Sequence, residues 1–155
     1  MEHGNVSPGI AKGLLALQRR IKAANVPSSK LDETVNVATW NIREFGKKPR
    51  TEAAVHYIAE ILGQFDLIGV VELRDDLTDL GRVLKILGPY WRAVYSDAIP
   101  DPGGNRERIA FLYDKRAGRE QRAAGFRLAS LGKAWPRVPG FSPRSRFGLV
   151  LDLES

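Results

Sequence analysis

The chain of 155 residues contains no cysteine, a single methionine and two histidines. The absence of cysteine excludes disulfides, zinc–thiolate sites and a cysteine nucleophile. No apolar run approaches the ~20 residues that a membrane-spanning helix needs. The apolar stretch "GLLAL" near the N-terminus is too short for a secretory signal. We therefore expect a cytoplasmic protein without a membrane partner.

The composition is that of a folded globular protein. Hydrophobic residues make up 43% of the chain and charged residues 27%, and this length allows one domain with a real core. The net charge of +6 arises at the end of the chain: residues 1–114 hold 15 basic and 15 acidic residues, whereas residues 115–155 hold 9 and 3. A basic tail either binds phosphate backbones or is a solvated end, so the total charge by itself does not indicate a nucleic-acid partner.

Apolar periodicity predicts an α/β fold in the middle of the chain. We expect a first region, residues 1–33, made of an amphipathic helix over 8–24 and a linker, and a second region over 34–155. In the second region we predict strands over 34–40, 66–73, 90–96 and 108–114, and helices over 51–65, with Thr51 as N-cap, and 76–88. This alternation is typical of α/β proteins. Residues 116–146 show no sustained period and predict an irregular basic tail, and "FGLVLDLES" at the end is typical of a strand.

Polar side chains follow two of the predicted strands where each strand ends. Asn41 follows the first strand, and Glu72 comes directly after the buried run "DLIGVV". An α/β sheet presents its functional groups outside the carboxyl ends of its strands, and amide and carboxylate oxygens suit Mg²⁺ or Ca²⁺. Arg43 and Arg74 would then offer forked donors to phosphate oxygens. From the residues alone, Asn41 can equally be a turn former.

Three motifs, "ATWNIREFG", "FDLIGVVELRD" and "GGNRERIAFLYDKR", occur in this order along the chain. Together they resemble the endonuclease/exonuclease/phosphatase superfamily, most closely its DNase I-like branch, over residues 34 to about 116. The resemblance implies a partial β-sandwich, with one mixed sheet of four or five strands and flanking helices. It also implies a metal-dependent phosphodiesterase of the nuclease type. The implied cofactor is Mg²⁺ (or Ca²⁺ or Mn²⁺), and the implied partner is nucleic acid, with DNA favoured.

The resemblance assigns roles to individual residues. Asn41 and Glu72 are similar to the metal-site residues of the family, and Glu107 to the carboxylate that orients its catalytic histidine. Arg43 and Arg74 are similar to the arginines that hold the nucleic-acid phosphates. A further phosphate-binding arginine corresponds to Arg144, although Arg146 stands where the family usually has proline.

The later motifs of that family are absent: the chain has no Gly-Asp-x-Asn and no Ser-Asp-His. We expect His3 to lie in a frayed terminus and His56 to be structural or exposed on a helix, so Glu107 has no histidine to orient. Three explanations stay open: a truncated enzyme, a remnant of a frameshifted gene, and a natural short protein. On each of them we expect a weak or inactive catalyst.

Two other functions stay open from the sequence. One is a phosphatase or phospholipid phosphodiesterase built on the same metal core. The other is a non-catalytic module that binds phosphate or nucleic acid. With only one sheet of the sandwich, an apolar sheet face would lack a partner, and we expect self-association through it.

Overall fold

The computed structural model describes residues 1–26, 35–96, 99–100 and 106–117. The helices are α1 (Pro8–Ala23), α2 (Glu52–Leu62) and α3 (Thr78–Leu87), and the strands are β1 (Val37–Phe45), β2 (Leu67–Leu73), β3 (Trp91–Tyr95), β4 (Ile99–Pro100) and β5 (Arg106–Asp114). The predicted tail, with Arg144, and most of the predicted linker lie outside the described residues.

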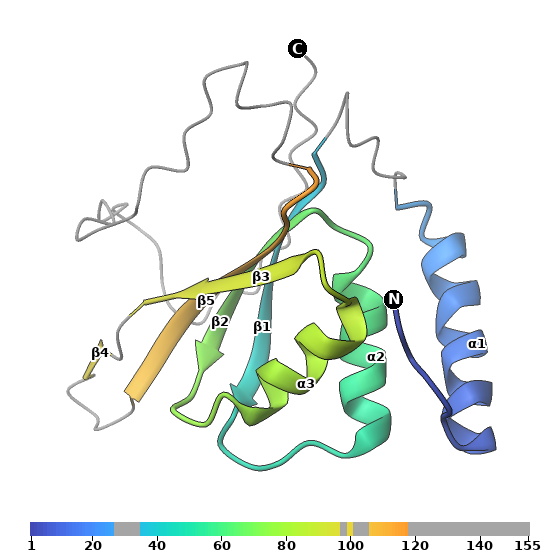
Figure 1. The fold of residues 1–155 in the computed structure, drawn as a ribbon, viewed down its shortest axis with the longest axis horizontal. Helices are drawn as coiled ribbons and strands as arrows, with labels where there is room; N and C mark the ends of the chain where they lie inside the picture. Colours follow the sequence, from blue (N-terminus) through green and yellow to red (C-terminus); the bar gives the residue numbers. More distant parts are fainter. Residues whose placement is uncertain (27–34, 97–98, 101–105, 118–155) are drawn as a thin grey trace.

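The strands form one mixed sheet in the order β1-β2-β5-β3, and the short β4 pairs with β5. β1 and β2 are parallel, whereas β5 is antiparallel to both β2 and β3. Helices α2 and α3 cover one face of the sheet, and α1 packs outside α2, away from the strands (Figure 1). The predicted α/β class, with one mixed sheet and flanking helices, is confirmed.

The core lies between the sheet and the two covering helices. Ile68 and Val70 alternate along β2 and are fully buried, and they share one apolar cluster with Leu62 of α2 and Val83 of α3. Each such side chain contributes roughly 1.5–3 kcal/mol of transfer free energy when it leaves water. This cluster fixes the sheet against the helices, and so it fixes the strand ends that carry the polar residues.

The helix boundaries follow local chemistry. The hydroxyl of Thr51 accepts a hydrogen bond from the backbone N–H of Ala54 at 3.2 Å, which confirms the predicted N-cap of α2. α3 ends before Gly88, whose φ of 102° is a conformation that glycine adopts without a side-chain clash.

Three features differ from the predictions. β1 continues five residues beyond the predicted end at Trp40, because Phe45 still pairs with β2 and its carbonyl accepts from the Arg74 N–H at 2.7 Å. A short strand, β4, forms in a segment that the sequence predicted as turns. His3 is not frayed, since both of its ring nitrogens have hydrogen-bond partners.

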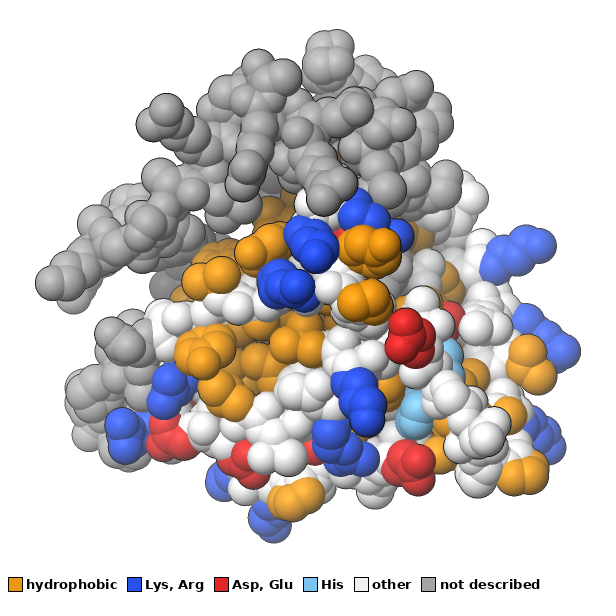
Figure 2. Space-filling model, in the orientation of Figure 1, with side chains coloured by type: hydrophobic (Ala, Val, Ile, Leu, Met, Phe, Trp, Pro, Cys, Tyr) orange, Lys and Arg blue, Asp and Glu red, His pale blue; other side chains and the backbone are white. Residues whose placement is uncertain are grey.

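Among the helices of the described residues, none is both long and apolar enough to span a bilayer. Figure 2, in the orientation of Figure 1, shows orange hydrophobic side chains gathered left of centre, on the side of the strands, with charged side chains around them. The exposed large hydrophobic side chains include Tyr90, Val94 and Tyr95 in and beside β3.

Candidate functional site

The polar residues predicted at the strand ends do lie at one edge of the sheet. β1 and β2 are parallel, so their carboxyl ends meet there, and β5 begins at the same edge because it is antiparallel to β2. The strand pairing shifts register between Asn41 and Phe45 on β1, and again close to the end of β2. At these irregularities Glu44 and Glu72 adopt positive φ angles of 50° and 61°.

The irregular end of β2 decides the direction of the Glu72 side chain. Uninterrupted alternation would place Glu72 on the buried face with Ile68 and Val70. Instead Leu73 takes the buried position, with 0% exposure, and Glu72 is half-buried. A non-glycine residue at positive φ costs on the order of 1–3 kcal/mol, which burial of Leu73 offsets. In this conformation Glu72 Oε1 accepts a hydrogen bond from Asn41 Nδ2 at 2.6 Å. The structure therefore brings the two predicted metal-site residues together.

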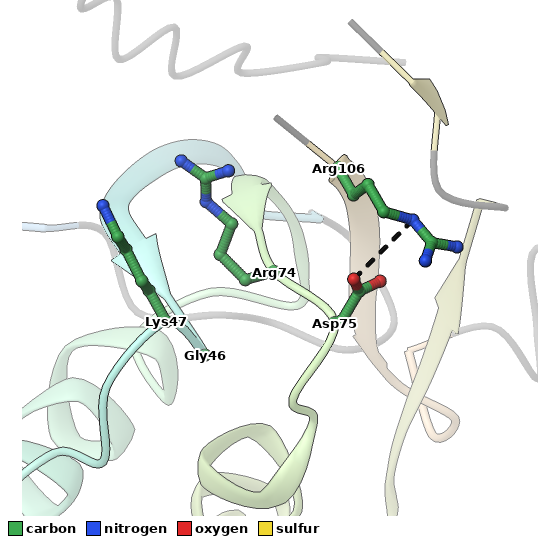
Figure 3. Close-up of a pocket in the computed structure, with 5 residues that line it drawn as sticks. All are labelled: Gly46, Lys47, Arg74, Asp75 and Arg106. Atoms are coloured by element: carbon green, nitrogen blue, oxygen red, sulfur yellow. Dashed lines mark ion pairs between the residues drawn. The ribbon is translucent and has the colours of Figure 1, made fainter. Parts of the chain in front are cut away.

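Arginines and carboxylates join the end of β2 to the start of β5. Arg74 Nη2 lies 3.3 Å from Glu107 Oε1. The carboxylate of Asp75 contacts Arg108 Nη2 at 3.1 Å. It also lies 3.7 Å from Arg106 Nε, the ion pair drawn in Figure 3. Arg74 is the best enclosed of the three arginines, with 15% of its side chain exposed, and its Nε has no hydrogen-bond partner. This Nε is buried, as is the unpartnered Nε of Arg108, so neither atom is accessible to a ligand at this edge.

A shallow pocket of about 280 Å³ opens at this edge, lined by Gly46, Lys47, Arg74, Asp75 and Arg106. Figure 3 shows the side chains of Lys47 and Arg74 extending in the same direction from two neighbouring loops, so that their charges lie on one side of the pocket. Two cations side by side with an open face suit an anionic ligand such as a phosphate group.

The carboxylate of Glu44 partly neutralises the positive charge of Lys47 and Arg74. A hydrogen bond from Lys47 lowers the pKa of the Glu44 carboxyl below its ordinary value, and the charges of Arg43 and Arg74 act in the same direction. Glu44 is therefore ionised at neutral pH and partly neutralises the three cations. Arg43 itself is exposed, and its backbone carbonyl accepts a hydrogen bond from the guanidinium of Arg50. The edge is thus a mixed field of cations and carboxylates.

The donor set fits one kind of metal site. The amide oxygen of Asn41 and the carboxylate of Glu72 are hard oxygen ligands of the type that Mg²⁺ prefers. Within the described ranges, no group of three or more His, Cys, Asp or Glu side chains could hold a metal ion. Protein magnesium sites commonly use one or two carboxylates and complete the shell with water and phosphate oxygens. The two residues therefore fit a metal held jointly with a phosphate-bearing ligand.

Both histidines of the chain are engaged away from Glu107. His56 lies on α2, where its Nδ1 is 2.8 Å from Nδ1 of His3, and Nε2 of His3 is 2.8 Å from Glu60 Oε2. We predicted that His56 would be either structural or exposed on a helix. His56 is buried, so the first of these alternatives holds. Glu107 pairs with Arg74 instead of a histidine.

Sequence reasoning missed several residues of this edge, namely Lys47, Asp75, Arg106 and Arg108. Their signal was present: "GKK" follows β1, "RDD" contains Asp75 after β2, and "RER" opens β5. These charges follow or open the same strands as the predicted residues, so pairing the three strand ends would have found them. Arg144 lies outside the described residues.

About half of the chain is similar in sequence to Deoxyribonuclease-1 of mammals. The chain is 33% identical to the human protein over 85 residues, which is 52% of this chain and 30% of the human protein. It is 33% identical to the dog protein over 84 residues (51% of this chain, 30% of the relative) and 31% identical to the horse protein over 85 residues (52% and 30%). No protein-family model and no solved structure matches the chain.

These matches cover less than a third of each relative's length. Over that stretch they indicate a distant DNase I-like relationship, and the mixed sheet with flanking helices is compatible with part of a DNase I-like fold.

Proposed function

We propose that this chain carries part of the active site of a metal-dependent phosphodiesterase of the nuclease type, in the endonuclease/exonuclease/phosphatase superfamily, with DNA as the favoured substrate. One observation carries the proposal: Asn41 and Glu72 meet at 2.6 Å at the same sheet edge as the cationic pocket of Lys47 and Arg74. The similarity to Deoxyribonuclease-1 supports the choice of nucleic acid over other phosphoesters.

Asn41 and Glu72 would hold the metal, Mg²⁺ by their donor chemistry, together with a phosphate oxygen of the substrate. When bound, such a metal stabilises the negative charge that develops on the phosphoryl oxygens and the leaving group. Arg74 and Lys47 bind this phosphate from the pocket side, and Arg43 and Arg106 bind neighbouring phosphates of the same nucleic-acid strand. The Arg74–Glu107 pair positions the guanidinium. No histidine lies beside these residues to transfer a proton, so turnover by this chain is slow.

The test is cleavage of plasmid DNA by the full chain, with Mg²⁺ and with EDTA. Glu72→Gln and Asn41→Ala are expected to lower the Mg²⁺-dependent rate by at least about tenfold, since each removes one of two protein ligands. Glu52→Gln, an exposed carboxylate in the first turn of α2, serves as the matched charge control and keeps the rate. Cleavage that survives EDTA, or that neither site substitution lowers, would refute the metal-site assignment.

A non-catalytic phosphate-binding module is the second candidate, and the absence of histidine near Glu107 among the described residues favours it. Binding of labelled DNA that Arg74→Gln weakens, without cleavage by the parent chain, selects the module over the enzyme. A phosphatase or phospholipid phosphodiesterase would instead release phosphate from a monoester, or the headgroup from a lipid, under the same conditions.

A further inference from the structure

The first residues of the chain are fastened to α2 by two histidines and a glutamate. Nδ1 of His3 lies 2.8 Å from Nδ1 of His56, and Nε2 of His3 lies 2.8 Å from Glu60 Oε2. Gln18 of α1 donates to the other oxygen of Glu60 at 3.0 Å. Glu60 and His56 are buried, with 3% and 6% exposure. These are the only two histidines in the sequence, and the pale-blue side chains in Figure 2 belong to this pair.

This cluster holds residues 1–6, which we name the N-terminal strap, and α1 against α2. The strap makes a further backbone hydrogen bond, from the Glu2 N–H to the Ile86 carbonyl at the end of α3, at 2.6 Å. α1 approaches α2 so closely at Gly13 that a Cβ there would lie 1.8 Å from Tyr57 Oη. In Figure 1 α1 stands apart from the sheet, with α2 between them. The attachment of α1 therefore depends on its contacts with α2 and on the strap.

The geometry of the cluster limits how many protons it can bind. The Nδ1–Nδ1 contact needs one proton between the two nitrogens, and the His3–Glu60 contact needs a proton on Nε2 of His3. Both contacts exist when the two rings are neutral, and both survive one added proton, because one imidazolium Nδ1–H can donate to the other ring's lone pair. A second added proton places N–H groups on both facing nitrogens. The hydrogen bond is then lost and two like charges face each other.

The groups around His56 disfavour binding of the second proton to its ring. Burial lowers the pKa of His56 most, and the charge of His3 lowers it further. Glu52 on the same helix raises this pKa by a smaller amount, and Arg82 on α3 lowers it by less again. Glu60 faces His3 rather than His56, and α1 contributes the neutral Gln18. A lowered histidine pKa means that the attached state binds fewer protons than the free state. The contribution of His56 to attachment is therefore greatest above the ordinary histidine pKa of about 6.5 and weakens as the pH falls below it.

We propose that His3, His56 and Glu60 form a pH-sensitive clasp that holds the N-terminal strap and α1 on α2 at neutral pH and releases them in mild acid. Once the cluster holds one added proton, release takes up one more, so the equilibrium shifts about tenfold per pH unit. The clasp is independent of the proposed phosphodiesterase site, because none of its residues lies at the sheet edge of Asn41 and Glu72.

Hydrogen exchange of the full chain tests this proposal at pH values between about 7.5 and 5, after correction for the intrinsic exchange rate. The amides of α1 are expected to lose protection about tenfold per pH unit below about 6.5, while those of β2 keep theirs. Parallel loss in β2 would mean global unfolding and would overturn the clasp, as would α1 protection that is flat with pH.

Two variants and one spectrum separate the clasp from a merely structural contact. His56→Asn keeps a donor and an acceptor near the Nδ1 position but binds no proton, so α1 stays protected in mild acid. His3→Ala leaves α1 unprotected at every pH. Because a substitution at buried His56 can disturb the fold, imidazole NMR of the parent chain gives an independent reading. The clasp requires that the His56 ring titrate below the ordinary histidine pKa, and a His56 titration near about 6.5 would refute it.

Discussion

Gly46 connects β1 to the loop that leads into α2. The loop between β2 and α3 lies so close to Gly46 that no space remains for a side chain there. The φ of Gly46 is +88°, and a Cβ built there would lie 2.2 Å from the backbone carbonyl oxygen of Asp76. Asp76 belongs to the loop between β2 and α3, so a side chain at Gly46 would collide with the backbone of that loop. The loop that contains Gly46 is also tied to α3, since the Arg50 N–H donates to Asp79 at 2.7 Å and Arg82 donates to the Arg50 carbonyl at 3.0 Å.

Gly46→Ala is expected to lower the free energy of unfolding by about 3 kcal/mol. A non-glycine residue at positive φ costs roughly 1–2 kcal/mol, and forcing extra volume into a packed position costs typically 1–3 kcal/mol. The smaller entropy of the unfolded alanine chain returns less than about 1 kcal/mol of this. The result would be a large share of the 5–15 kcal/mol that such a domain usually has.

Urea denaturation followed by tryptophan fluorescence measures this loss as a shift of the midpoint at unchanged slope. Gly81→Ala is the matched control, because Gly81 is exposed on α3 and a Cβ there meets no atom within 4 Å. Alanine at that position should raise stability by about 0.5–1 kcal/mol through helix propensity. A Gly46→Ala variant as stable as the parent, or a destabilising Gly81→Ala, would refute the argument from loop contact.

Two more predictions concern charge. Burial raises the pKa of the Asp114 carboxyl, but hydrogen bonds from the Arg116 side chain and backbone outweigh burial and hold the pKa below 3.8. Ionised Asp114 therefore stabilises the fold above that pH, and this stabilisation is lost as the pH falls through the folded pKa. Arg116→Gln should therefore move the midpoint of acid unfolding, followed by circular dichroism, to higher pH. An unchanged midpoint would contradict this. In DNA-binding titrations, Arg74→Gln should reduce the slope of log affinity against log salt by about 0.9. Arg92→Gln makes the same charge change on β3, where Arg92 pairs with Tyr113 at the end of β5 opposite to the pocket, and should leave that slope unchanged. Equal effects of the two substitutions would exclude a phosphate contact at Arg74.

The sequence by itself determined where the three helices and the longer strands form, although not the short β4 or the extension of β1 to Phe45. Apolar spacing in residues 8–24 and 51–65 predicted α1 and α2, and the continuous run "LIGVV" predicted a buried strand, because burial periodicity is set by the geometry of each element. It also predicted that Asn41 and Glu72 would share one edge, since parallel strands end together. Local chemistry identified Thr51 as an N-cap in the same way.

Only the tertiary structure decided how Glu72 points and where the histidines lie. A period-two pattern would place the Glu72 side chain in the core. In the folded protein Leu73 takes the buried position under the helices instead, and Glu72 adopts a positive φ. This conformation turns the Glu72 carboxylate toward Asn41. His3 and His56 are 53 residues apart in the sequence, and no local pattern pairs them. Their contact exists because α2 packs against α3, where the strap is bound at Ile86. Such contacts depend on packing between distant segments, which residue patterns within one segment do not encode.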